Sequence, residues 1–158
     1  MNAASVSDIK KELSVASNAE LVALCLRLAR FKKENKELLT YLLFESHDEE
    51  QYLQKVKEEL ETEFAAINFS HVYYAKKSLR KILRLINKYS RYTDQATTET
   101  AWRIHFCELL LQTKLNIKRD KSLTKMYEGQ LQKIKKLLST MHEDLQYDFK
   151  KALNELAI

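Results

Sequence analysis

Histidine, cysteine and carboxylate side chains are the groups through which this chain of 158 residues could do acid–base, nucleophilic or metal chemistry. Its four histidines are scattered along the chain, at His47, His71, His105 and His142. A carboxylate-bridged di-iron bundle needs a glutamate three residues before a histidine on two helices, and none of these histidines has one. The sequence therefore predicts no metal site and no cofactor.

His105 and Glu108 form the best remaining acid–base candidate, because they share a narrow polar strip on an otherwise apolar segment. A hydrogen-bonded structural histidine is the simpler interpretation. Cys107 lies two residues from His105, so the two side chains point to different faces of a helix. Cys25 and Cys107 both lie in apolar helical patterns and are expected to be buried free thiols. No catalytic residue is assigned, and the chain is predicted not to be an enzyme.

A basic stripe is the strongest candidate for a binding surface. Residues 70–92 contain seven basic and no acidic residues, a net charge of +7. Five of the seven recur at helical i, i+3 and i+4 spacing opposite an apolar face, with tyrosines at both ends. This basic stripe consists of Lys77, Lys81, Arg84, Lys88 and Arg91. Cations next to aromatic rings can hold a nucleic-acid backbone and stack on bases, so the stripe is a possible surface for an anionic partner.

The acidic segment directly before it offers a second interpretation of the stripe. Residues 46–69 carry a net charge of −5, so the two segments together carry only +2. An antiparallel helix pair with complementary flanks has this pattern. The net charge of the whole chain, +5, is also modest for a protein that binds nucleic acid. We therefore favour mutual compensation over a dedicated polyanion surface.

Residues that break helices are almost absent. The chain has no proline and one glycine, Gly129, while 31% of its residues are charged and 45% are hydrophobic. Inside a helix, proline costs about 3 kcal/mol and glycine about 1 kcal/mol. The sequence therefore predicts an all-α fold and excludes Gly-rich phosphate-binding loops.

Capping boxes mark the expected helix starts. They are Ser5 with Asp8, Ser17 with Glu20, and Ser46 with Glu49. Further helices are expected to begin at Asn35, at Ser70 and after Thr93, although residues 19–44 could also form one bent helix.

The last two helical segments differ from the others. The segment from about residue 95 to 115 contains Trp102 and is apolar on more than one face, so we expect it at the centre of the fold. Residues 122–156 keep one apolar period that would give a helix of roughly 50 Å, against a diameter of about 40 Å for a compact domain of this size. A break near Ser139 is favoured, with Thr140 and Glu143 as the next capping box, and a single helix is the alternative.

Residues 79–87 and 131–139 resemble each other at an offset of 52 residues. Stacked helical hairpins produce such internal similarity. Chance resemblance between two basic amphipathic helices produces it as well. The sequence leaves both a helical bundle and a short superhelical stack of the HEAT or TPR kind open.

The stretch KKENKELL at residues 32–39, the acidic segment, and YAKKSL at residues 74–79 resemble a family of small, uncharacterised helical bacterial proteins. The resemblance covers about residues 7–155. It implies a helical cytoplasmic fold and carries over no functional residue, because the family has no assigned activity.

These observations predict one all-α domain over residues 1–158, with six to eight antiparallel helices. Charged residues precede any apolar run, and the longest apolar stretch, residues 21–26, is far shorter than the roughly 20 residues of a membrane span. We therefore expect a cytoplasmic protein without a membrane partner. Its expected function is a non-enzymatic protein–protein interaction or scaffold module, and the alternative is a nucleic-acid-associated protein that uses residues 71–92.

Overall fold

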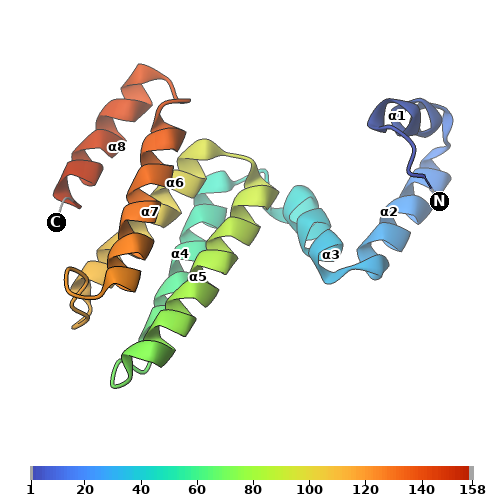
Figure 1. Cartoon of the computed structure of the whole chain (residues 1–158). Coiled ribbons are helices and arrows are strands. Elements are labelled where there is room, and N and C mark those ends of the chain that lie inside the picture. Colours follow the sequence, from blue (N-terminus) through green and yellow to red (C-terminus); the bar gives the residue numbers. More distant parts are fainter. Residues whose placement is uncertain (1, 157–158) are drawn as a thin grey trace. The chain divides into compact units, whose positions relative to one another are not determined.

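A computed structural model of the chain describes residues 2–156, in which there are eight α-helices, one short π-helix and no strand (Figure 1). The expected all-α fold of six to eight helices is confirmed. By internal contacts the chain divides into two units, Met1–Phe44 and Glu45–Ile158. Among the described residues, no helix is both long and apolar enough to cross a membrane.

The first unit contains α1 (Val6–Val15), α2 (Asn18–Phe31) and α3 (Lys33–Thr40), and the π-helix η1 (Tyr41–Glu45) spans the boundary. The predicted capping box of Ser17 with Glu20 is confirmed, because the two residues exchange both bonds. Ser5 is confirmed as the cap of α1, since its hydroxyl accepts the N–H of Asp8 at 3.2 Å, but the Asp8 carboxylate accepts from the Ser5 hydroxyl and not from its backbone N–H. Both caps satisfy N–H groups that a helix start leaves without an intrahelical acceptor.

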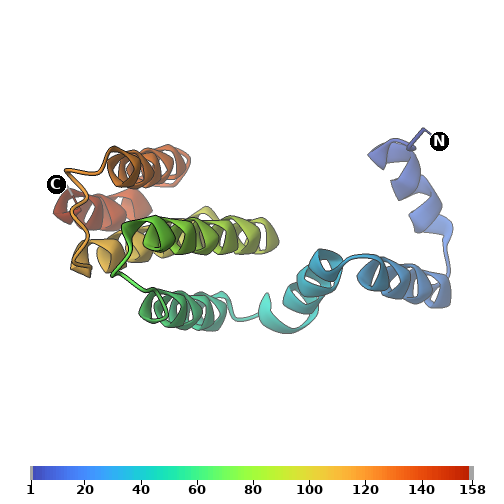
Figure 2. The same ribbon diagram turned by 60° about the horizontal axis from the view of Figure 1, so that its bottom comes forward.

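The second unit contains α4 (Glu49–Ala65), α5 (Val72–Thr93), α6 (Ala96–Gln112), α7 (Lys121–Leu138) and α8 (Glu143–Glu155). Each helix contacts the next one along the chain, and α6 also contacts α4 and α8 (Figure 2). The helices α4, α6 and α8 thus form one layer, and α5 and α7 lie over it. The two similar segments, residues 79–87 and 131–139, fall on α5 and α7, and their equivalent residues Ile82 and Ile134 are both fully buried. Whether they descend from a repeat stays a prediction.

The central position expected for the segment around Trp102 is confirmed, because α6 contacts all four other helices of its unit. The side chains of Trp102, Phe106 and Leu110 are 0% exposed. The ring of Phe106 meets that of Phe64 on α4 edge-on, with centroids 5.4 Å apart. A helix enclosed by protein needs apolar residues around its circumference, which is the pattern that singled out this segment.

The expected break near Ser139 is also confirmed, since α7 ends at Leu138 and α8 begins at Glu143. The Tyr127 hydroxyl donates to the Leu156 carbonyl oxygen at 2.7 Å and fixes the end of α8 against α7. Burial raises the pKa of Tyr127 to about 12, so this donor stays protonated. Gly129 lies inside α7 and interrupts nothing.

For four helices, the predicted capping residue was wrong. The cap of α4 is Asp48, which accepts the N–H of Gln51 at 2.9 Å, and not Ser46. The helices α3, α5 and α8 begin after Lys32, His71 and His142 instead of Asn35, Ser70 and Thr140. A carboxylate is favoured by the positive end of the helix dipole, which accounts for Asp48.

Candidate interaction surfaces

The predicted polar strip on α6 faces α4. The Nε2 atom of His105 lies 3.0 Å from Oε1 of Glu61, and its Nδ1 lies 3.6 Å from Oε2 of Glu108. The histidine side chain is only 16% exposed. His105 thus lies between two carboxylates of the helix pair, but its buried Nε2 makes no hydrogen bond, so the hydrogen-bonded structural histidine stays a prediction. Among the described residues, no group of three or more His, Cys, Asp or Glu side chains could hold a metal ion.

The two thiols differ from each other. Cys107 is buried as expected, and burial raises its pKa to about 12. Its sulfur is therefore protonated at neutral pH and is a poor nucleophile. Cys25 is exposed, so the prediction that it is buried was wrong. The reason is that α2, on which it lies, has too few neighbours to bury any of its residues.

Part of the basic stripe is paired with the acidic helix. The Nζ atom of Lys81 lies 2.8 Å from Oε2 of Glu63 on α4. Nearby, the hydroxyl of Tyr89 donates to the carboxylate of Glu59 at 2.9 Å. These bonds hold α4 and α5 together through their charged flanks, which is the compensating arrangement expected from the opposite charges of the two segments.

Other basic residues of α5 contact α7. The Nζ atom of Lys76 lies 2.9 Å from Oδ2 of Asp120, the N-cap of α7, and Arg80 donates to the Ser122 hydroxyl at 3.1 Å. The hydrogen bond from Lys76, with further ones from the backbone of α7, lowers the pKa of Asp120. The basic side chains of α5 thus interact with residues of two neighbouring helices, α4 and α7.

The remaining members of the basic stripe do not form one continuous cationic site. Lys77, Arg84 and Arg91 are exposed, and Lys88 is half-buried. The Nζ atom of Lys88 lies 4.7 Å from the centre of the Tyr89 ring, a cation–π distance. The part of the basic stripe that is best placed to contact an anionic partner is therefore the exposed surface around Lys77 and Arg84.

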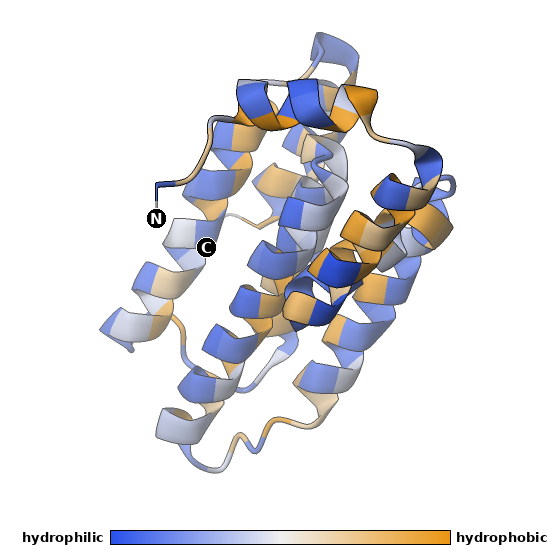
Figure 3. Ribbon diagram, turned by 90° about the vertical axis from the view of Figure 1, so that its right-hand side faces the viewer, coloured by the Kyte–Doolittle hydropathy of each residue, from blue (hydrophilic) through white to orange (hydrophobic). Residues whose placement is uncertain are grey.

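A different surface, which the sequence interpretation missed, lies on the α2–α3 hairpin. Ten of the fourteen residues of α2 are apolar, so hydrophobic positions surround most of the helix (Figure 3). None of the residues of α1, α2 or α3 is buried. Twelve large apolar side chains of the unit's described residues are exposed, among them Phe31 at 74%, Leu43 at 61% and Phe44 at 65%. A helix with this pattern is normally enclosed by other protein.

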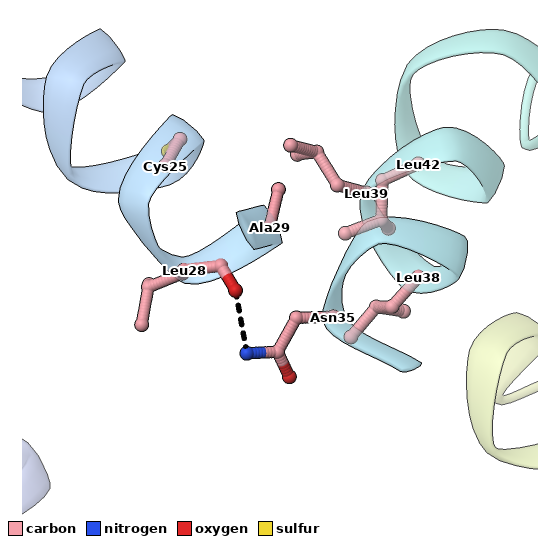
Figure 4. Close-up of a pocket in the computed structure, with 7 residues that line it drawn as sticks. All are labelled: Cys25, Leu28, Ala29, Asn35, Leu38, Leu39 and Leu42. Carbon is pink, nitrogen blue, oxygen red and sulfur yellow. Dashed lines mark hydrogen bonds between the residues drawn. The ribbon is translucent and has the colours of Figure 1, made fainter. Parts of the chain in front are cut away.

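The two helices of the hairpin meet at a corner of defined geometry. Lys32 has extended backbone angles between α2 and α3, and the Asn35 amide donates to the Leu28 carbonyl oxygen at 2.9 Å (Figure 4). Beside this bond lies a cavity of about 240 Å³ with a mostly leucine lining, which includes Leu28, Leu38 and Leu39. The side chain of Asn35 therefore holds the corner together instead of capping α3.

A larger hollow, of about 700 Å³, is lined by residues of α2, α3 and η1. Most of its lining is apolar and includes Leu26, Leu39, Leu43 and Phe44. Three cations, Arg30, Lys33 and Lys36, also line it. The Nζ atom of Lys33 lies 3.7 Å from Oε1 of Glu37, so Lys33 also forms an ion pair within α3. We call this the basic-rimmed hollow. It combines exposed hydrophobic area with a positive border.

No family model, curated protein or solved structure matches this chain.

Proposed function

We propose that the chain is a non-enzymatic protein-interaction module that binds an acidic amphipathic helix of another protein in the basic-rimmed hollow. The observation that carries the proposal is the exposure of Leu26 on α2 and of Leu43 and Phe44 on the adjoining η1. None of the residues of α2 or α3 is buried. Exposed apolar patches bordered by polar residues mark protein interaction sites. Grooves of this kind accept the apolar face of an amphipathic helix.

The charges on the rim support the choice of an acidic partner. Arg30 and Lys36 line the hollow beside its apolar residues, and complementary charges steer association and exclude partners of the same sign. Burying one large apolar side chain contributes about 1.5–3 kcal/mol. Two or three side chains of a partner helix in the hollow would contribute about 3–9 kcal/mol. Micromolar binding requires about 8 kcal/mol after the cost of association, so ionic contacts of acidic residues with the rim are needed as well.

Photo-crosslinking from the hollow tests this proposal. With benzoylphenylalanine in place of Leu43, we expect a discrete crosslink to a protein in cells that make this chain. The reversal Arg30→Glu with Lys36→Glu should remove that crosslink, while Lys10→Glu with Lys11→Glu on α1 should leave it. A probe in place of Tyr147 on α8, 76% exposed, is the matched control. Equal crosslinking from both probes, or binding of the chain to anionic lipid vesicles instead, would contradict the proposal.

Nucleic-acid association through α5 is the second candidate function, and the exposed side chains of Lys77 and Arg84 favour it. The pairing of Lys81 with Glu63 weighs against it. We therefore expect the variant with glutamine at Lys77, Lys81, Arg84 and Lys88 to lose little stability, because exposed ion pairs contribute about 0–1 kcal/mol each. Its retention on heparin should match that of the wild type. Wild-type binding to RNA or DNA below about 1 μM at physiological salt, lost in this variant, would reverse the order of the two candidates.

A further inference from the structure

One stripe of α2 faces away from its contacts with α3. Cys25, Leu28 and Ala29 line the cavity toward α3, whereas a second, open hollow of about 350 Å³ lies along another stripe of the helix. This second stripe, which we call the α2 stripe, consists of Glu20, Ala23, Leu24 and Arg27, and Ala16 at the end of α1 also lines the hollow. It shares no residue with the basic-rimmed hollow.

The α2 stripe is complementary to itself. Glu20 and Arg27 are seven residues apart, which is about two helical turns, and the midpoint between them lies between Ala23 and Leu24. If two copies of α2 pack antiparallel about this midpoint, Glu20 of each copy meets Arg27 of the other. A two-fold interface requires this reciprocal arrangement. Ala23, next to the axis, leaves room for close approach of the two backbones.

We infer that a second copy of this chain packs antiparallel against the α2 stripe, with the two-fold axis between Ala23 and Leu24. Glu20 is ready for the ionic contact, since the N–H of Ser17 donates to its carboxylate at 2.8 Å and fixes the side chain. This hydrogen bond also lowers the pKa of Glu20, which keeps the carboxylate charged. Each contact is made twice by symmetry.

The α2 stripe supplies only part of the apolar surface that a dimer needs, and the rest of the first unit exposes more. A buried aliphatic side chain removes roughly 60–120 Å² of apolar surface from water, from its transfer free energy at about 25 cal/mol/Å². The twelve exposed apolar side chains of the whole unit thus present on the order of 500 Å², while a standard interface buries about 800 Å² on each partner in total. Of the twelve, Leu24 lies on the α2 stripe, and Leu26, Leu43 and Phe44 line the basic-rimmed hollow. A chain segment of 44 residues is also near the lower limit for folding without a partner.

The oligomeric state of the full-length chain tests the inference. We expect sedimentation equilibrium at micromolar concentration to give about twice the monomer mass of 18.6 kDa. Arg27→Glu places like charges opposite each other at both ends of the interface and should weaken the dimer about tenfold or more. Glu20→Arg should do the same, and an equimolar mixture of the two variants should form the heterodimer with near wild-type affinity. Arg91→Glu on α5 is the control.

Cysteine crosslinking provides a test that does not alter the charges or the cap. In a Cys25→Ser background, Ala23→Cys should form an intermolecular disulfide rapidly under mild oxidation, because the two sulfurs meet near the axis. Ala19→Cys should not, since its copies lie roughly 13 Å apart along the helices at 1.5 Å per residue, too far for a disulfide. A monomer at 100 μM, or a dimer that Arg27→Glu leaves intact and in which both cysteines react equally, would overturn the inference. Either result leaves the proposed use of the basic-rimmed hollow untouched, because the two sites share no residue.

Discussion

Replacing Trp102 with alanine is expected to lower the free energy of unfolding by about 3–5 kcal/mol. The indole is 0% exposed, and its Nε1–H donates to the Leu53 carbonyl oxygen at 3.1 Å. It also meets the Tyr52 ring edge-on, with centroids 5.6 Å apart. The truncation removes the packing of a whole bicyclic ring and leaves a cavity where α6 contacts α4. Urea denaturation followed by circular dichroism measures the loss.

Two further variants separate packing from hydrogen bonding at this position. Trp102→Phe keeps most of the aromatic packing but leaves the Leu53 carbonyl without its donor, so it should cost less than alanine. Tyr147→Ala, at an exposed position on α8, should change stability by no more than about 0.5 kcal/mol. If Trp102→Ala melts like the wild type, the side chain is not at the centre of the second unit.

Replacing Arg103 with methionine should cost a similar amount, about 3–5 kcal/mol. Its guanidinium is buried, with the side chain 3% exposed. It donates to Glu99 Oε1 at 2.7 Å, Gln130 Oε1 at 2.7 Å and Asn87 Oδ1 at 2.8 Å, which joins α5, α6 and α7. Methionine fills much of the volume but leaves these acceptors, one of them a carboxylate, without a donor. Urea denaturation at neutral pH measures the effect.

The carboxylate explains most of that expected loss, and a double variant checks this. Adding Glu99→Gln to Arg103→Met removes the uncompensated charge, so the double variant should recover about 1–3 kcal/mol relative to the single one. If the stability losses of the two single variants simply add in the double variant, Arg103 and Glu99 do not act as a pair.

Helix content could be predicted from the sequence, whereas the capping residues could be predicted only in part. Ser5 and Ser17 both cap as expected, although Asp8 and Asn18 also have side chains suited to a cap. Before α4, Ser46 competes with Asp48 two residues later, and the carboxylate takes the cap. Asn35 has the right side chain for a cap, yet its amide bonds to the Leu28 carbonyl across the corner. Such tertiary contacts leave no local signal.

The candidate surfaces show the same limit. The compensation between α4 and α5 could be predicted from charge alone, and Lys81 with Glu63 is one instance of it. The exposed face of α2 was missed although the sequence contains its signal. A helix with apolar residues on several sides was interpreted as central in α6, and that prediction was correct. The same pattern in α2, which includes Cys25, belongs to a helix with few neighbours. The periodicity of apolar residues indicates that a helix must be buried by other protein. It does not indicate which segment or partner buries it.

The order in which the helices of the second unit contact one another also bears on how fast the chain folds. Its helices pack mainly against their immediate neighbours in sequence or the next but one. Closing such short loops costs little conformational entropy, and chains with mostly local contacts cross the folding barrier in microseconds to milliseconds. During synthesis, each helix can therefore find its neighbour soon after it emerges. In the α2–α3 hairpin, by contrast, none of the residues of either helix is buried, so these helices gain little stability from contacts within their own unit.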